Sequence, residues 1–320
     1  MDRRSFTFSA LGAMAAIPLG GRAMAAGYPS RTIEMIVPYS AGGGTDLVAR
    51  AFADIANQSL AKAIGVVNRT GGGGAVGLTG IARARPNGFT IGLGTAEITM
   101  LPHMGMASFT ASDFTAIAQL NADPSAITVK ADAPWQTLEE FLAHAKENPG
   151  TVRIGNSGTG AIWHLAAEAL GKEVGATFNH IPFEGAAPAV TALLGGHIEA
   201  VSVSPAEVSN FVAAGELRML GVMADERVAA FPDVATFKEQ GVDLSVGTWR
   251  GVLVPNGLPE EALSVLREVA ATAGQSEEFK AQLAKMNLNH AYMDADAFQA
   301  KIAAQDEFFG ELMTELGMAR

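Results

Sequence analysis

The chain has 320 residues, of which 48% are apolar and none is cysteine. This length suggests two domains with ample buried cores, and the missing cysteines exclude a disulfide framework and thiol chemistry. Acidic residues outnumber basic ones by 33 to 22, which gives a net charge of −11. That charge disfavours nucleic acid as a partner. An anionic ligand would have to be held by local dipoles, because the overall field repels it.

The first 25 residues have the order of an export signal. Arg3 and Arg4 precede an apolar run from Phe6 to Leu19, and small residues follow at Ala23–Ala25. The segment "DRRSF" is similar to a twin-arginine motif, although its flanking residues depart from that motif, and the general secretory route is the alternative. Removing the segment leaves 19 basic and 32 acidic residues, so the mature net charge becomes −13. We expect a protein exported to the periplasm, without a later membrane span.

Strand and helix patterns alternate in the first half. "TIEMIVPY" predicts a strand, Asp46 to Ala63 a helix, "IGVVNR" a strand, "GAVGLTGIARAR" a helix and "FTIGLGT" a third strand. This order is typical of parallel βαβ units. "FTAIAQLNADPSAITVKAD" then predicts two extended segments, and Pro134-Trp135 interrupts the pattern before a new helix.

The same plan restarts in the second half, with strands at "TVRIGNS", "TFNHIPF", "HIEAVSVS" and "LRMLGVM". The tail predicts three helices without new strands, at Pro259–Ala273, Glu277–Met286 and Ala295–Gly317. Such helices have no sheet of their own and should pack on the first domain. We therefore predict a two-lobed α/β fold with chain crossings near 124–133 and 245–254. Lobe one comprises 26–127 and 250–320, and lobe two comprises 128–249.

The loops that follow the strands combine small residues with hydroxyl groups. They are "YSAGGGTD" and "GTAE" in lobe one, and "NSGTGAIWH", "PFEGAA" and "SVSPAE" in lobe two. Loops that follow parallel strands meet at one edge, where helix starts offer N–H groups to an anion. The alternative for Gly42–Gly44 is an ordinary turn with Thr45 or Asp46 as the helix cap.

The segments that resemble enzyme motifs each depart from the pattern that the chemistry needs. Gly72, Gly74 and Gly77 satisfy G-x-G-x-x-G, but no suitably placed acidic residue follows, and a flexible loop is favoured. Ser157 lies in "GNSGT", which is not a hydrolase elbow. His164 and Glu168 share a helical face as metal ligands can, yet a satisfied histidine is favoured over zinc. We expect no catalytic residue, metal or cofactor.

Six segments together resemble the periplasmic solute receptors of tripartite tricarboxylate transporters, the Bug-type family. They are "YPSRTIEMIVPYSAGGGTDLVAR", "VVNRTGGGGAVG", "RPNGFTIGLGT", "NPGTVRIGNSGTGAIWHLAAE", "HIPFEGAAPAVTALLGGHIEAV" and "WRGVLVPNGLP". The resemblance implies a monomeric Venus-flytrap receptor that is not an enzyme. It would close on a small organic acid and deliver it to a large and a small integral membrane subunit.

The resemblance also implies the positions that hold the ligand. In lobe one they are Tyr39, Ser40, Ala41, Gly42, Gly43, Thr45 and Asp46. In lobe two they are Ser157, Gly158, Thr159, Gly160 and His164, with Phe183 and Ser204 near the distal end of the ligand. We add Thr95, Glu97 and Trp163 as candidate ligand-binding residues on the same loops.

Three of these residues depart from the family pattern. Phe183 stands where tyrosine is frequent. If Glu97 faces the cleft, it repels a second carboxylate and favours an amine, a hydroxyl or a neutral group. If it instead caps the helix that starts at this position, it says nothing about the ligand. Trp163 could stack on an aromatic ligand, shorten the pocket or pack. The bound acid stays open, as do a sensory role that docks on a membrane signalling protein and an enzyme of the same fold using His164 or Glu97 as a base.

Overall fold

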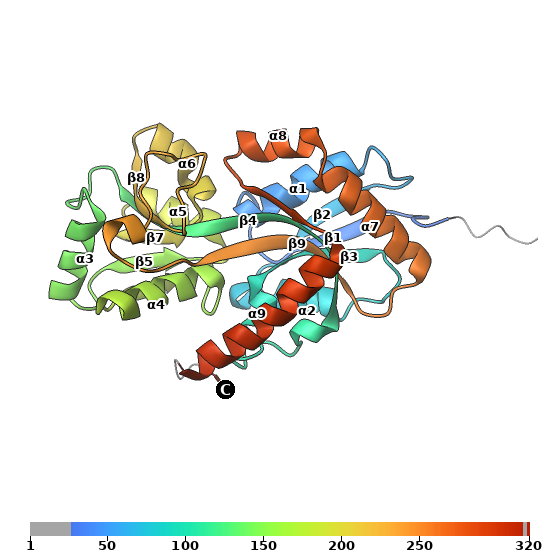
Figure 1. Cartoon of the computed structure of the whole chain (residues 1–320), viewed down its shortest axis with the longest axis horizontal. Helices are drawn as coiled ribbons and strands as arrows, with labels where there is room; N and C mark the ends of the chain where they lie inside the picture. Colours follow the sequence, from blue (N-terminus) through green and yellow to red (C-terminus); the bar gives the residue numbers. More distant parts are fainter. Residues whose placement is uncertain (1–26, 316–318) are drawn as a thin grey trace, which may run out of the picture.

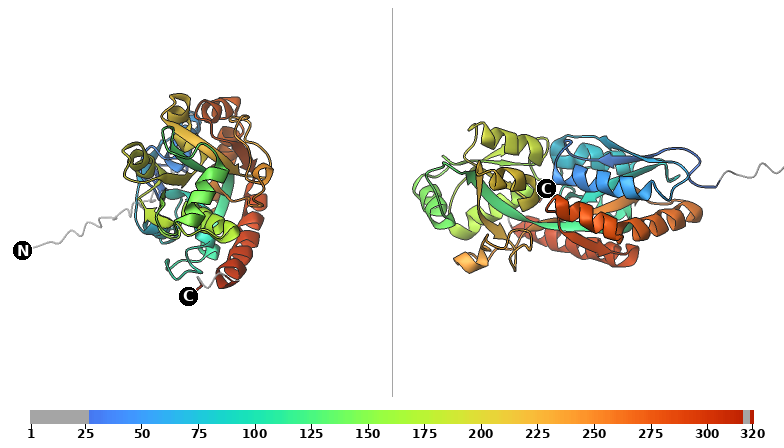
Figure 2. Two further views of the ribbon diagram at one scale, coloured as in Figure 1. Left: turned by 90° about the vertical axis from the view of Figure 1, so that its left-hand side faces the viewer. Right: turned by 90° about the horizontal axis from the view of Figure 1, so that it is seen from above.

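The computed structural model describes residues 27–315 and 319–320, so the predicted export signal lies outside the described residues. Two α/β lobes lie side by side along the long axis of the molecule (Figure 1). Views from the end and from above show helices on both sides of the strands in each lobe (Figure 2). Within the described ranges, no helix combines the length and apolarity needed to cross a membrane.

Lobe one is built on three parallel strands, β1 (Ile33–Val37), β2 (Ile64–Asn68) and β3 (Thr90–Thr95). The predicted βαβ units are present, because α1 (Gly44–Ala56) follows β1 and α2 (Ala75–Ala82) follows β2. Helix α1 is shorter than predicted, since it ends at Ala56. The stretch before α2 was expected to be a flexible loop. It is instead a short 3-10 turn, η1 (Gly72–Gly74), and a side chain on Gly73 would collide with the backbone of lobe two, 2.5 Å from the Thr159 carbonyl oxygen.

The chain crosses between the lobes twice, through β4 (Phe114–Lys130) and β9 (Gly247–Pro255). The prediction of two extended segments was wrong, because β4 is one strand of 17 residues that continues through Pro124. Its pairing changes there: residues up to Pro124 pair with β9, and those from Ser125 pair with β8 (Leu217–Met223). The missing proline N–H is tolerated at this change of partners. The domain limits given above stay a prediction.

Lobe two repeats the plan around the second half of β4. Its strands β5 (Arg153–Asn156), β6 (Asn179–Pro182) and β7 (Ala200–Val203) are parallel to one another, and β7 and β8 run antiparallel to β4. Its helices are α3 (Leu138–Glu147), α4 (Ile162–Val174), α5 (Ala186–Leu194) and α6 (Pro205–Ala213), with a short 3-10 helix, η4 (Lys238–Gln240). Helix α3 starts with a capping box in which Thr137 accepts from the Glu140 N–H at 3.2 Å.

The C-terminal helices α7 (Glu260–Gly274), α8 (Glu277–Lys285) and α9 (Ala295–Glu315) return to lobe one, as predicted. Helices α7 and α8 share a core with α1 on one face, whereas α9 packs with α2 and η2 (Ala96–Thr99) on the other. A further 3-10 turn, η3 (Ala111–Asp113), precedes β4. The expectation of no new strand was wrong, because β10 (His290–Met293) pairs antiparallel with β4. It is a half-buried strand of four residues, too short to show alternation in the sequence.

Candidate ligand site between the lobes

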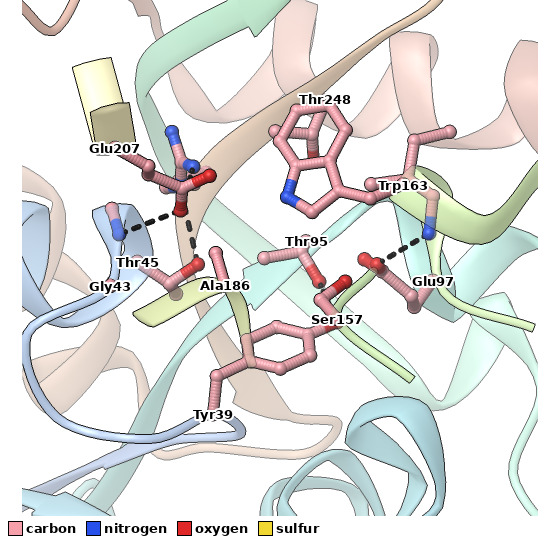
Figure 3. A pocket seen from close by; sticks show the side chains of 13 residues that line it. Tyr39, Gly43, Thr45, Thr95, Glu97, Ser157, Trp163, Ala186, Glu207 and Thr248 are labelled. Atoms are coloured by element: carbon pink, nitrogen blue, oxygen red, sulfur yellow. Dashed lines mark hydrogen bonds and ion pairs between the residues drawn. The ribbon is translucent and has the colours of Figure 1, made fainter. Parts of the chain in front are cut away.

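An enclosed pocket lies where the carboxyl ends of the parallel strands of both lobes meet (Figure 3). Its interior has a cavity volume of about 20 Å³. That interior holds about one ordered water. A ligand of several atoms therefore requires the lobes to move apart.

Seven of the predicted residues line the pocket: Tyr39, Gly43, Thr45, Thr95, Glu97, Ser157 and Trp163. The remaining predicted residues lie outside the lining: Ser40, Ala41, Gly42, Asp46, Gly158, Thr159, Gly160, His164, Phe183 and Ser204. Six lining residues were not predicted: Gly44, Ile162, Ala186, Glu207, Thr248 and Arg250. Five of these six lie inside the loops or motifs quoted above, so the segments were visible in the sequence even though these residues were not chosen.

The lobe-one loop is shaped from within by Asp46. Helix α1 begins at Gly44 with Gly43 as its N-cap, so neither Thr45 nor Asp46 is the cap. The Asp46 carboxylate accepts from the Gly42 N–H at 2.9 Å and from Arg50 and Asn68, each at 2.9 Å. Burial by itself would raise the Asp46 pKa, but the hydrogen bonds from Arg50, Gly42 and Asn68 outweigh it and lower that pKa. Asp46 therefore fixes the conformation of the Gly42–Gly44 loop from behind, without lining the pocket itself.

The lobe-two loop is shaped in the same way by two side chains. Asn156 Oδ1 accepts from the Gly158 N–H at 3.0 Å, and His164 Nδ1 accepts from the Gly160 N–H at 3.2 Å. His164 is thus a positioning residue of the loop. Phe183 packs against the apolar core of the molecule.

His164, Glu168 and His180 form a cluster whose ligand-type atoms lie within 4.8 Å of one another. A metal on His164 Nε2 would require a proton on Nδ1. The Gly160 N–H points at Nδ1, which assigns the proton to Nε2 instead. His164 Nε2 lies 3.5 Å from Glu168 Oε1 and His180 Nε2 lies 3.3 Å from it. The geometry therefore fits two histidines that share one carboxylate better than it fits a metal centre.

Glu207 reaches from lobe two to the start of α1 in lobe one. Its Oε1 accepts from the Gly44 N–H at 2.9 Å (Figure 3). Its Oε2 accepts from the Ser204 N–H at 2.9 Å. Arg250 Nη2 lies 3.7 Å from Glu207 Oε1. Burial raises the Glu207 pKa, and the charge of Arg250 opposes that rise.

Arg250 is itself 1% exposed and makes a dense set of contacts. Its guanidinium forms an ion pair with the buried Asp123 carboxylate and donates to Asn121. Its Nε donates to the Thr45 hydroxyl at 3.1 Å. This arginine therefore ties β4, β9 and α1 together at the pocket wall.

Glu97 makes the opposite crossing, from lobe one to lobe two. Its Oε1 accepts from the Ile162 N–H at 2.9 Å, at the first residue of α4 (Figure 3). Glu97 therefore lines the pocket, and it does not cap the short helix η2 in which it lies, whose N-cap is Thr95. The helix start that it bonds is that of α4 in the other lobe. Trp163, which is 3% exposed, lines the pocket and belongs to the same apolar cluster as Ile98 and Leu101 of lobe one.

Tyr39 forms the floor between these crossings. Its hydroxyl donates to the Gly73 carbonyl at 3.3 Å and lies 3.3 Å from the Thr95 hydroxyl. Burial, followed by the negative charge of Glu97, raises the Tyr39 pKa well above its usual value. Tyr39 consequently stays a neutral hydrogen-bond donor.

The two lobes touch at the pocket rim. The Ser40 N–H donates to the Glu184 carbonyl at 3.0 Å, and the Ser40 hydroxyl donates to the same oxygen at 2.6 Å. Together with the Glu207–Gly44 and Glu97–Ile162 bonds, these contacts define a closed arrangement.

This architecture, two α/β lobes joined by two crossing strands around an enclosed pocket, is that of a periplasmic binding protein. Residues 48–318 match the tripartite tricarboxylate transporter family receptor, TctC. The chain belongs to this family of solute receptors and is a binding protein rather than an enzyme. A relative from Cupriavidus necator, the UPF0065 protein in the gbd 5′ region, is 31% identical over 326 residues, covering 100% of this chain and 99% of that one.

Solved structures agree with this assignment and confirm the two-lobed fold. A crystal structure of a TctC solute-binding protein from Polaromonas, without ligand, is 46% identical with a TM-score of 0.66 and covers 90% of this chain and 99% of its own. The periplasmic binding protein BugD is 29% identical with a TM-score of 0.86 and covers 91% and 99%. MatC from Rhodopseudomonas palustris with bound malate (24% identical, TM-score 0.82, 89% and 99% covered) and Rpa4515 with adipate (23%, 0.86, 91% and 99%) share the fold.

Proposed function

We propose that the protein captures a small organic acid in the pocket between its lobes, in the periplasm, and presents it to the membrane subunits of a tripartite tricarboxylate-type transporter. The observation that carries this proposal is the meeting of polar groups from both lobes around one buried space. Hydroxyls of Tyr39, Thr45 and Ser157 line it, and helices α1 and α4 start at its edge. The hydroxyl groups of Thr45 and Ser157 can donate to a carboxylate, whereas the first N–H groups of α1 and α4 are bonded to Glu207 and Glu97 in this closed arrangement.

The mechanism is hinge closure. The lobes are joined by β4 and β9, so they can open about these two strands without breaking either core. An acid binds to the lobe-one wall first, and lobe two then closes over it through the Ser40–Glu184 and Glu207–Gly44 contacts. The comparisons support this motion: the relative without ligand has the higher identity, 46%, but the lower TM-score, 0.66. A relative with similar lobes set at a different angle to each other would give a high sequence identity together with a low TM-score.

Two experiments test the proposal. Mass spectrometry of small molecules released from freshly purified protein should identify an organic acid, because a closed cleft retains its ligand. Thermal-shift screening of the wild type against mono-, di- and aminocarboxylates should raise the unfolding midpoint with at least one class. Silence across the whole panel, with no acid released, would contradict the proposal.

A further inference from the structure

One carboxylate in the pocket wall lacks a partner for its second oxygen. Glu97 is 1% exposed, and its Oε1 is satisfied by the Ile162 N–H at 2.9 Å. Its Oε2 is fully buried and has no hydrogen-bond partner among the described residues. The side chain lies in the pocket wall with its carboxylate turned towards the interior (Figure 3). A buried acceptor left in this state costs free energy unless a ligand or a water satisfies it.

The charges around the pocket do not balance. Glu97 and Glu207 line it, and Asp123 lies directly behind, bonded to Arg250. Among the lining residues of the described chain, Arg250 is the one cation, and it is held by Asp123 with Glu207 3.7 Å away. None of the ion pairs among the described residues includes Glu97, and its Oε2 accepts no hydrogen bond from them. A buried carboxyl group in this position is stabilised by a ligand group that donates to it, and most strongly by a charged donor.

Both helix starts that could hold ligand carboxylates are occupied by the protein's own acids. Glu207 accepts from Gly44 at the start of α1, and Glu97 accepts from Ile162 at the start of α4. A ligand with two carboxylates would have to displace Glu97 and bring its second charge beside it. The free Oε2 of Glu97 instead offers an acceptor to a donor group of the ligand, such as an ammonium group.

We propose that Glu97 Oε2 binds an ammonium group, so that the ligand is an amino-bearing monocarboxylic acid rather than a di- or tricarboxylate. This inference rests on the proposed function of the pocket and names the class of acid. The ammonium end lies at Glu97, between Thr95 and Trp163. The carboxylate end lies toward Thr45, whose hydroxyl accepts from Arg250 Nε and can direct its own proton to the ligand.

Calorimetric titrations with matched probes test this assignment. For chains of four, five and six carbons, the probes are the ω-amino acid, the dicarboxylate and the plain monocarboxylate, such as 4-aminobutanoate, succinate and butanoate. They are titrated into the wild type, Glu97→Gln and Glu173→Gln at pH 7.5. Glutamine keeps the oxygen that accepts from Ile162, so the fold and the closed state are retained. Glu173 is exposed on α4 and provides the same change of charge away from the pocket.

At one or more lengths, we expect the amino acid to bind the wild type at least tenfold more tightly than its dicarboxylate. Glu97→Gln should weaken that amino acid at least tenfold without weakening the dicarboxylate, and Glu173→Gln should match the wild type. A dicarboxylate that binds the wild type more tightly than its amino acid, or an amino acid unaffected by Glu97→Gln, would overturn the inference and leave the acid receptor intact. If no probe binds the wild type, the inference is overturned, and the acids released on purification together with the thermal-shift panel decide the proposed function separately.

Discussion

The two loops that face each other across the pocket, Tyr39–Thr45 in lobe one and Ser157–Trp163 in lobe two, follow one design with different charge. In each, a side chain accepts from a loop glycine, Asp46 from Gly42 and His164 from Gly160. In each, the first N–H of the following helix goes to a glutamate of the opposite lobe.

The two loops differ in the surroundings of the glutamate that the opposite lobe contributes, Glu207 or Glu97. Both oxygens of Glu207 are bonded, and Arg250 lies beside it. Glu97 has one bonded oxygen and no neighbouring cation among the described residues. The Glu207–Gly44 bond is an internal latch, because both oxygens of its acid are bonded and a cation lies beside it. The same backbone geometry at Glu97 and Ile162 leaves one carboxylate oxygen without a donor among the described residues and free to accept from another group.

The largest expected effect on stability comes from removing Arg250, the cation that lies beside Glu207 and has no counterpart beside Glu97 among the described residues. Arg250→Met leaves Asp123 and Glu207 buried together without compensation, so we expect a loss of about 3–5 kcal/mol in the free energy of unfolding. Urea denaturation measures it. The control Arg227→Met removes an ion pair whose partners are 44% and 45% exposed, and should cost about 1 kcal/mol or less. Similar losses for the two variants would mean that Arg250 does not neutralise the latch.

A side chain at Gly44 should hinder the Glu207–Gly44 contact and so weaken closure of the lobes on the ligand. A Cβ on Gly44 would lie 2.6 Å from Arg250 Nη2 and 3.0 Å from Glu207 Oε1, and Arg250 cannot retreat because Asp123 and Asn121 hold it. Gly44→Ala should therefore weaken binding of the acid that stabilises the wild type most by about a hundredfold, roughly 2.7 kcal/mol. Calorimetry gives the affinity. Gly65→Ala meets only an ordinary contact at 3.7 Å and is the control. Unchanged affinity in Gly44→Ala would show that the latch is dispensable.

The histidine pair behind the lobe-two loop should give a smaller, pH-dependent effect. Burial, followed by the neighbouring His180, lowers the His164 pKa below 6.5, and burial lowers the His180 pKa likewise. As the pH falls, these two histidines therefore become protonated in the unfolded chain before they do in the folded protein. The contribution of the histidine pair to the free energy of unfolding is complete above pH 6.5 and declines as the pH falls below that value.

Thermal unfolding between pH 7.5 and 5.5 should therefore show a steeper decline in the wild type than in a variant with His164→Gln and His180→Gln. His197→Gln, at an exposed position before β7, should retain the wild-type slope. Equal slopes in all three proteins would contradict this role for the pair.

The smallest expected effect is at the rim. Ser40→Ala removes the 2.6 Å hydrogen bond to the Glu184 carbonyl but keeps the backbone bond at 3.0 Å. We expect about 0.5–1 kcal/mol less ligand affinity, a few-fold in Kd, from calorimetry. Ser59→Ala, which loses a bond inside lobe one at 3.1 Å, should leave affinity unchanged. A loss beyond tenfold would place Ser40 on the ligand itself.

Local patterns predicted much of this molecule. The alternation of strands and helices, the return of the C-terminal helices to lobe one and the loops that meet at the pocket are all readable, because hydrophobic period and glycine placement act over short distances. The wrong predictions concern segments whose structure depends on pairing with a distant strand. Strand β10 forms because it pairs with β4, and β4 continues through Pro124 because its pairing partner changes there from β9 to β8.

What the sequence by itself determined is the class of receptor and the segments that build its cleft. Tertiary structure decided which side chains of those segments matter. Glu207 reaches Gly44 across 163 residues and Glu97 reaches Ile162 across 65, so neither bond leaves a spacing to read. The physical reason is that a helix start attracts any carboxylate within reach, and only folding determines which acid arrives there and whether a cation comes with it.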